Sequence, residues 1–163
     1  MDNLSLEQAD LIASGVVNCI KRNSFAPITV NVIDQSGDVL VTKRMDGCAS
    51  KAIPDFSYAK AYTAVGMKIS SRQFRDKYTT GGDPAKFCQM TSMVSITGGN
   101  MAPFPGGVYM KNANGKTLGA VGVSGAAGDE DEYCALRGII EAGYKDIITV
   151  PDKPNCKTVK DKF

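Results

Sequence analysis

The sequence predicts an α+β fold, in which one five-stranded antiparallel sheet carries helices mainly on one face. Helical patterns open and close the chain, while the β-branched segments between them lack the strand–helix alternation of a parallel sheet. A length of 163 residues with 43% hydrophobic residues is typical of one domain with its own core. We expect a single domain over residues 1–149 and a loosely attached C-terminal tail over 150–163, which holds two prolines.

The first expected element is a helix over residues 6–22. Ser5 and Gln8 have the spacing of a capping box, and apolar residues recur behind them at helical intervals. Two β-branched segments follow, over 28–34 and 39–44, with a glycine-containing turn between them. This pattern predicts a β-hairpin.

A second helix is expected over residues 54–69, because Pro54 suits its first turn and most of its positions are apolar or small. A short helix should continue to Tyr78, a weaker helical turn should follow over 84–89, and the segment 92–97 is expected to be a strand. The remaining expected elements are a Gly/Pro-rich loop over 98–105, strands over 107–111 and 117–124, and a last helix over about 129–142.

The charge pattern excludes several classes of partner. The 19 basic residues are scattered and are balanced by 17 acidic ones, so we expect no nucleic-acid partner. No apolar run approaches the roughly 18 residues of a membrane span, and the first residues do not resemble a signal peptide. The five cysteines contain no C-x-x-C motif and favour reduced thiols. We therefore expect a cytoplasmic protein without a membrane partner.

The chain contains no histidine. Histidine is the usual general base near neutral pH, the commonest zinc ligand and a common axial ligand of haem. Its absence excludes Ser-His-Asp and Cys-His hydrolysis, and we predict no metal site. The methionines are interpreted as core residues.

Two cations stand in positions that need a partner. Arg44 directly follows the predicted hairpin, and Lys60 lies within an otherwise apolar helix. A buried lysine is costly unless it forms an ion pair or contacts a ligand. One interpretation is a ligand site, and the other is a structural ion-pair network of Arg44 and Lys60 with Asp46 and Asp131.

An ordered set of motifs carries a resemblance to a known family. The motifs are Val32-Ile33-Asp34-x-x-Gly37-x-Val39-Leu40 leading to Arg44-Met45-Asp46-Gly47, Lys60-Ala61-Tyr62-Thr63-Ala64, the pairs Gly98-Gly99 and Gly106-Gly107, Asn114-Gly115, and Gly119-Ala120-Val121-Gly122-Val123-Ser124-Gly125 followed by Asp131-Glu132. This set resembles the GlcG/HbpS family, also called the haem-degrading domain family, which includes the C-terminal domain of PduO proteins.

The resemblance implies a GlcG/HbpS-like α+β subunit that assembles into homo-oligomers, with some members binding or slowly degrading haem. We therefore expect a small-molecule-binding protein, with haem or another tetrapyrrole as the candidate ligand. Without histidine, the axial ligand of a haem iron would have to be Tyr, Met, Cys or Lys. The predicted ligand-binding residues are Arg44, Tyr62, Met67, Gly98, Gly99, Ser124 and Gly125.

An alternative hypothesis is a cofactor-independent enzyme that performs acid/base chemistry on a small carboxylate- or carbonyl-bearing substrate. In that case Lys60, Asp131 and Glu132 would be the catalytic residues. A third hypothesis is a structural or sensor subunit without pocket chemistry.

Two expectations about geometry follow. The pocket should lie where Arg44, Lys60, the loop 98–105 and the Ser124-Gly125 turn before Asp131 converge. The oligomer interface should use the small and apolar positions of 54–69 or 117–124.

Overall fold

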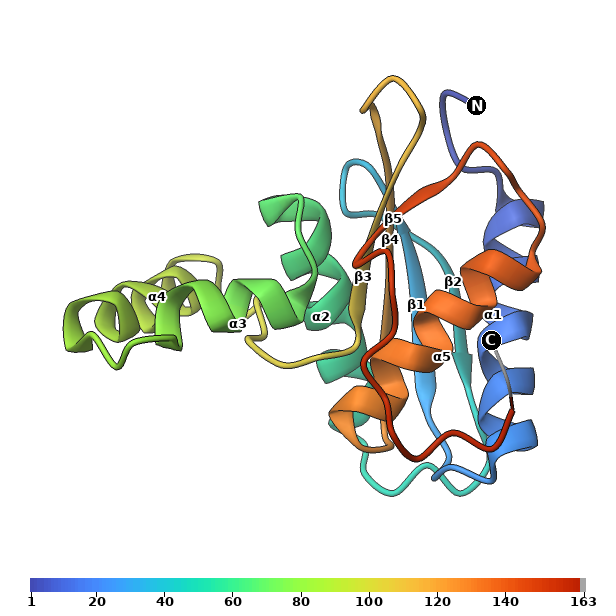
Figure 1. Ribbon diagram of the computed structural model, residues 1–163, viewed down its shortest axis with the longest axis horizontal. Coiled ribbons are helices and arrows are strands. Elements are labelled where there is room, and N and C mark those ends of the chain that lie inside the picture. The colour runs from blue at the N-terminus through green and yellow to red at the C-terminus, as the bar shows by residue number, and fades with distance from the viewer. Residues whose placement is uncertain (162–163) are drawn as a thin grey trace.

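The computed structural model describes residues 1–161, and its strands form one antiparallel sheet in the order β2-β1-β4-β3-β5 (Figure 1). The elements are α1 (Leu6–Asn23), β1 (Thr29–Asp34), β2 (Val39–Arg44), α2 (Ile53–Met67), α3 (Ser71–Thr79), α4 (Pro84–Ile96), β3 (Gly107–Lys111), β4 (Thr117–Ser124), α5 (Gly128–Glu141) and β5 (Ile148–Val150). The predicted five-stranded antiparallel α+β architecture is confirmed.

The helices are divided between both faces of the sheet, whereas we expected them mainly on one. α1 and α5 lie on one face and α2 lies on the other (Figure 1). The central strand β1 shows why: Val30 and Val32 belong to the core under α1 and α5, while Ile33 belongs to the core under α2. Asn31 also faces α2, where its Nδ2 donates to Ser57 Oγ at 3.0 Å. Successive side chains of a strand point to opposite faces, so β1 is buried on both.

Glycine allows α2 and α5 to lie very close to their neighbours. A Cβ at Gly122 in β4 would lie 2.0 Å from the carbonyl oxygen of Ser57 in α2. A Cβ at Gly138 in α5 would lie 2.5 Å from Val16 Cγ2 in α1. The glycine-bearing strand therefore makes room for a helix of the same chain.

Residues 92–96 belong to α4 and Thr97 is its C-cap, so the predicted strand there is wrong. Asp83 caps this helix by accepting a hydrogen bond from the Ala85 N–H at 2.9 Å, and Pro84 stands in its first turn. Met90, Met93 and Val94 recur at helical spacing and face the aromatic side chains of α3. The fifth strand is instead β5, whose three residues pair with β3.

α3, α4 and the loop that follows them project sideways from the sheet (Figure 1). We call residues 71–105 the arm. Phe74, Tyr78, Met90 and Met101 form its small core, which adjoins Met67 at the end of α2.

The C-terminal segment, which we expected to be loosely attached, makes specific contacts. The backbone N–H groups of Lys160 and Asp161 both donate to Asn23 Oδ1, at 2.7 and 3.2 Å. Tyr133 donates its hydroxyl to Asp161 Oδ1 at 2.8 Å. This segment therefore contacts both α1 and α5.

Candidate functional site

The residues that we predicted to form one site lie in three separate places. The first is a buried ion pair at the junction of α2, β4 and α5. Lys60 Nζ lies 2.9 Å from Asp131 Oδ2 and also donates to the Val123 carbonyl at 2.9 Å. Asp131 accepts a further hydrogen bond from the Ala126 N–H at 3.0 Å. Lys60 and Asp131 are 4% and 1% exposed, so both charges are removed from water.

Burial is the main influence on the Asp131 carboxyl. It raises the pKa of Asp131 to about 6, while the positive charge and hydrogen bond of Lys60 and the Ala126 N–H act in the opposite direction. The pair satisfies its own hydrogen bonds, which agrees with the structural ion-pair interpretation for these two residues.

Glu132 forms a second ion pair beside the first. Arg72 in α3 directs Nε at both carboxylate oxygens of Glu132, at 2.9 and 3.2 Å, and also pairs with Asp129. Burial raises the pKa of Glu132, and the Arg72 charge opposes that shift. The two pairs tie the first turn of α5 to α2 and to the arm.

The Ser124-Gly125 turn connects β4 to this junction without forming an opening. Ser124 is buried, and a Cβ at Gly125 would lie 2.5 Å from the carbonyl oxygen of Pro27. The turn contributes to the Lys60–Asp131 pair only through its backbone neighbours Val123 and Ala126.

The second place is a cavity of about 330 Å³ between α2 and α4, which we call the α2–α4 cavity. Its lining residues are Tyr62, Gly66, Met67, Met93, Ile96, Thr97 and Met101. Three thioethers thus share an otherwise apolar cavity with the phenol of Tyr62 and the hydroxyl of Thr97, and Gly66 leaves open space beside α2. Two of our predicted ligand-binding residues, Tyr62 and Met67, lie here.

Gly98 and Gly99 end α4 beside this cavity. Both have positive φ, and their N–H groups donate to Ser95 O at 3.0 Å and Val94 O at 2.9 Å. Glycine adopts this left-handed backbone without steric cost, so the pair forms the C-terminal cap of the helix.

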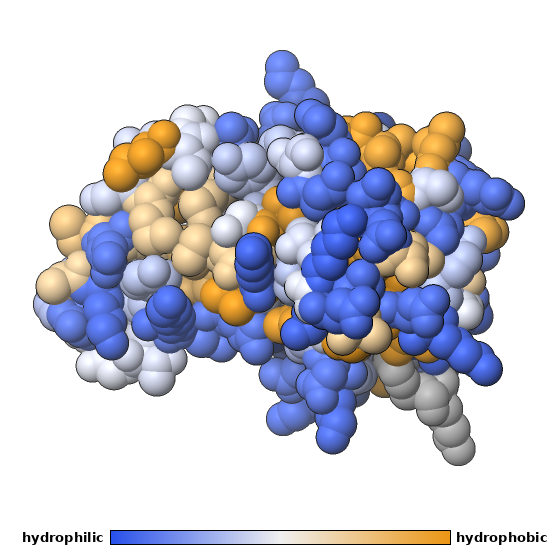
Figure 2. All heavy atoms as spheres, turned by 90° about the horizontal axis from the view of Figure 1, so that it is seen from above, coloured by the Kyte–Doolittle hydropathy of each residue, from blue (hydrophilic) through white to orange (hydrophobic). Residues whose placement is uncertain are grey.

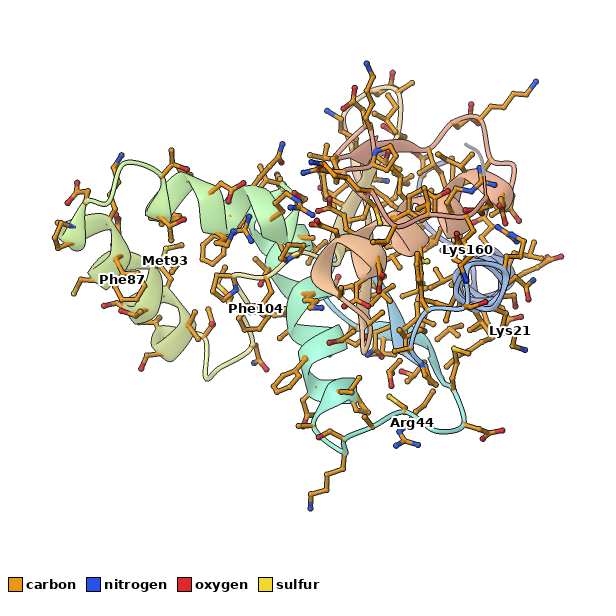
Figure 3. All side chains as sticks on the ribbon, turned by 60° about the horizontal axis from the view of Figure 1, so that its bottom comes forward. Lys21, Arg44, Phe87, Met93, Phe104 and Lys160 are labelled. Atoms are coloured by element: carbon orange, nitrogen blue, oxygen red, sulfur yellow. The ribbon has the colours of Figure 1, made fainter. Side chains whose placement is uncertain are left out.

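The third place is a cavity of about 440 Å³ between α1 and β2, lined by Val17, Lys21, Lys43, Arg44, Met45 and Asp46. Arg44 Nη2 donates to the Cys48 carbonyl at 2.9 Å. Figure 3 shows Lys21 and Arg44 on the opposite part of the molecule from Met93 and Phe87. Arg44 and the Lys60–Asp131 pair have different hydrogen-bond partners, and neither cavity is lined by all of the residues that we predicted to converge.

Sequence reasoning missed five residues of the α2–α4 cavity: Gly66, Met93, Ile96, Thr97 and Met101. Three of them, Met93, Ile96 and Thr97, lie in the segment that we predicted to be a strand. Neighbouring residues of a strand point to opposite faces, whereas a helix places residues three and four apart on the same side. The available signal was Asp83-Pro84, which begins a helix.

Two features are absent from the described part of the chain. Among residues 1–161, no group of three or more His, Cys, Asp or Glu side chains is placed to hold a metal ion. No helix in that part of the chain has both the length and the apolar character needed to cross a membrane.

Comparison with known proteins supports the family assignment. A family model described as haem-degrading protein, HbpS-like, matches residues 4–140. A 15.0 kDa protein of Citrobacter freundii, encoded between dhaT and dhaS and described as uncharacterized, is 32% identical over 109 residues, which cover 67% of this chain and 71% of that protein.

Two solved structures share the fold. The complex of PduOC with haem has a TM-score of 0.77 at 24% identity, and the match covers 91% of this chain and 99% of that one. A double mutant of HbpS from Streptomyces reticuli has a TM-score of 0.73 at 27% identity, and the match covers 88% and 90% of the two chains. With the family model matching most of its length, the chain belongs to the HbpS-like family of haem-degrading proteins.

Proposed function

We propose that this chain is a small-molecule-binding protein whose ligand is haem or another flat tetrapyrrole, held in the α2–α4 cavity. The observation that carries the proposal is the lining of that cavity, which is apolar apart from the phenol of Tyr62 and the hydroxyl of Thr97. Such a lining suits a large, flat, apolar ligand. The structure of PduOC with haem, which shares the fold, supports this class of ligand.

The side chains of the cavity fit a haem without histidine. Thioether and phenolate groups both serve as axial ligands of haem iron in proteins, and the cavity offers Met67, Met93, Met101 and Tyr62. Bound haem would supply redox and oxygen chemistry, while the protein would supply apolar contacts and one iron ligand. The remaining predicted ligand contacts, at Arg44, Gly98, Gly99, Ser124 and Gly125, do not line this cavity and are not part of the proposal.

The alternative of acid/base catalysis by Lys60 and Asp131 is less well supported. Both side chains are buried, bind each other, and line neither cavity. A catalytic acid or base must come within hydrogen-bond distance of the substrate. The binding proposal is therefore favoured over the catalytic one.

A haemin titration followed by visible absorption tests the proposal. We expect a saturable Soret band for the wild type. The band should shift or disappear in the one variant among Tyr62→Phe, Met67→Leu and Met93→Leu that removes the iron ligand. Gly66→Leu should bind haemin more weakly, because the leucine fills the open space beside α2. Met45→Leu is the matched control, because Met45 lines the other cavity. The absence of a saturable spectral change, or an equal effect of Met45→Leu, would contradict the proposal.

A further inference from the structure

Two buried cysteines lie next to the point where α5 crosses α1 (Figure 1). The helices meet at Gly15 and Gly138, where a Cβ at Gly15 would lie 3.0 Å from Gly138 Cα. Cys19 lies one turn after Gly15 in α1, and Cys134 lies one turn before Gly138 in α5. Residues four apart share a face of a helix, so both thiols point into the contact between the two helices.

This close packing suits a covalent bond between the two cysteines. A disulfide joins residues whose Cα atoms are about 4.4–6.8 Å apart, so it requires backbones that lie close together. Gly15 and Gly138 have no side chains to hold the helices apart, and the turns that carry Cys19 and Cys134 follow directly. The pair is therefore positioned for a disulfide within the folded subunit.

The two thiols also interact with each other. The side-chain interaction with Cys134 is the main cause that lowers the pKa of Cys19, while burial acts in the opposite direction. The same interaction, together with burial, raises the pKa of Cys134. Asn23 Nδ2 lies 3.6 Å from Cys19 Sγ and donates a hydrogen bond to it. Cys19 is therefore the thiol that ionises more readily, and the thiolate is the reactive form of cysteine.

The C-terminal segment is attached beside each cysteine of the pair. Asn23, which contacts Cys19, accepts a hydrogen bond from the Asp161 N–H at 3.2 Å. Tyr133, the neighbour of Cys134 in α5, donates its hydroxyl to Asp161 Oδ1 at 2.8 Å. The negative charge of Asp161 acts to raise the pKa of both thiols, so this residue lies close to both. Figure 1 shows the segment passing α5 and ending beside α1.

Neither thiol reaches the molecular surface. Cys19 and Cys134 are each 0% exposed, and Figure 2 shows many hydrophilic residues over the sheet domain, at the centre and right of the view. An oxidant in solution therefore needs a local opening to reach the pair. Terminal segments open at a lower free energy than the whole fold, and the segment attached at Asn23 and Tyr133 is the part nearest the pair.

We propose that Cys19 and Cys134 are an oxidisable dithiol, which a peroxide converts into an intramolecular disulfide between α1 and α5 when the C-terminal segment opens. The proposal does not depend on the proposed ligand. α1 and α5 cover one face of the sheet, whereas the α2–α4 cavity adjoins the helix on the other face.

The reaction takes two steps. The Cys19 thiolate attacks one oxygen of hydrogen peroxide, the O–O bond breaks, and a sulfenic acid forms while hydroxide leaves and takes up the proton that Cys19 released. The Cys134 sulfur then attacks the Cys19 sulfur, so that the S–S bond forms, the S–O bond breaks, and the hydroxyl leaves with the Cys134 proton as water. The two sulfurs together lose the two electrons that the peroxide gains. A small thiol reverses the reaction by thiol–disulfide exchange.

Peptide mapping after peroxide treatment tests the site. The full chain carries Cys88→Ser and Cys156→Ser, which remove the two cysteines that are not buried. Haemin is left out, because its iron reacts with peroxide. We expect hydrogen peroxide to link the peptides that contain Cys19 and Cys134, and dithiothreitol to separate them. Cys48→Ala is the matched control, since Cys48 is also buried but lies outside α1 and α5, and the link should persist in it.

The single variants of the pair make the test specific. Cys134→Ala should form no disulfide and should accumulate oxidised Cys19, because no second thiol is present to attack the sulfenic acid. Thiols that stay reduced in peroxide until urea unfolds the chain, or a disulfide that involves Cys48, would overturn the proposal.

Two further variants test the role of the C-terminal segment. Tyr133→Phe removes the hydroxyl that binds Asp161, and Asn23→Ala removes the oxygen that accepts its N–H. We expect the disulfide to form roughly fivefold faster in both, because each loses a hydrogen bond that holds the segment. Asn18→Ala, at an exposed position of α1, is the control, and circular dichroism will verify the fold. Equal rates in all three variants and the wild type would show that the segment does not control access to the pair.

Discussion

The ammonium group of Lys60 joins three elements, because it lies in α2 and binds a carbonyl of β4 and a carboxylate of α5. Both members of the Lys60–Asp131 pair are buried, so removing one of them would leave an uncompensated charge, which typically costs about 3–5 kcal/mol. At the residue scale, this cluster stabilises the junction where α5 begins.

The protonation of Asp131 should make stability depend on pH. Burial raises the pKa of Asp131 from 3.8 to about 6, so the folded protein retains a proton that the unfolded chain releases at lower pH. The free energy of unfolding should therefore decrease as pH rises from about 4 to about 6, and level off above. For this one group the decrease is at most about 3 kcal/mol.

Asp131→Asn removes the titrating carboxyl, so the free energy of unfolding of this variant should not show the decrease between about pH 4 and 6. Lys60→Met removes the charge that opposes the shift, so the decrease should extend to higher pH. Urea unfolding of both variants and the wild type across this range measures the difference. A stability difference between wild type and Asp131→Asn that does not change with pH would show that Asp131 titrates normally.

At the scale of elements, close helix packing depends on glycine at the contact of α1 with α5. Gly15 and Gly138 face each other there, and a Cβ at Gly15 would lie 3.0 Å from Gly138 Cα. The two helices therefore cover their face of the sheet as one layer, with no side chain between them at this point.

Gly138→Ala should destabilise the protein. The added Cβ would lie 2.5 Å from Val16 Cγ2 and 2.7 Å from the Ile12 carbonyl oxygen, so α5 must shift away from α1. Overpacking of this kind costs about 1–3 kcal/mol. Gly66→Ala is the control: its Cβ meets nothing within 4 Å, and alanine should stabilise α2 by up to about 1 kcal/mol. Chemical unfolding measures the free energy of unfolding of both variants. If Gly138→Ala loses no more of it than Gly66→Ala, the steric argument is contradicted.

At the scale of the whole molecule, a compact sheet domain carries two peripheral parts of opposite character. The C-terminal segment returns to the domain and is held by Asn23 and Tyr133. The arm leaves the domain and exposes apolar side chains (Figure 1). The first part completes the subunit, whereas the second part leaves Phe87 and Ile96 exposed to solvent.

Asn23→Ala should release the C-terminal segment. Asn23 is 1% exposed, and its Oδ1 accepts from the N–H groups of Lys160 and Asp161. Loss of these hydrogen bonds should cost about 1–3 kcal/mol and speed amide hydrogen exchange in residues 156–161. Asn18→Ala, at an exposed position of the same helix, is the control. Equal exchange in both variants would mean that other contacts hold the segment.

Local sequence patterns were enough to predict the first helix, the hairpin, the second helix, the strands β3 and β4 and the last helix. Ser5 and Gln8 form the expected capping box, with hydrogen bonds of 2.8 and 3.2 Å. These features are local, because capping, hairpin turns and apolar periodicity act over a few residues. The sequence also indicated that a lysine in an apolar helix needs a partner. The ion pair with Asp131, which was one of our two interpretations, agrees with the structure.

Contacts between distant segments set the surroundings of Arg44 and the conformations of α4 and β5. Arg44 and Lys60 both required a partner, and the structure gives them different ones: Arg44 binds the Cys48 carbonyl, whereas Lys60 binds the Val123 carbonyl and Asp131. Residues 92–97 have β-branched side chains that suit a strand, and their packing on α3 makes them helical. β5 has three residues and forms because β3 offers a free edge. Sequence patterns report local preference, whereas these outcomes depend on contacts between segments far apart in the chain.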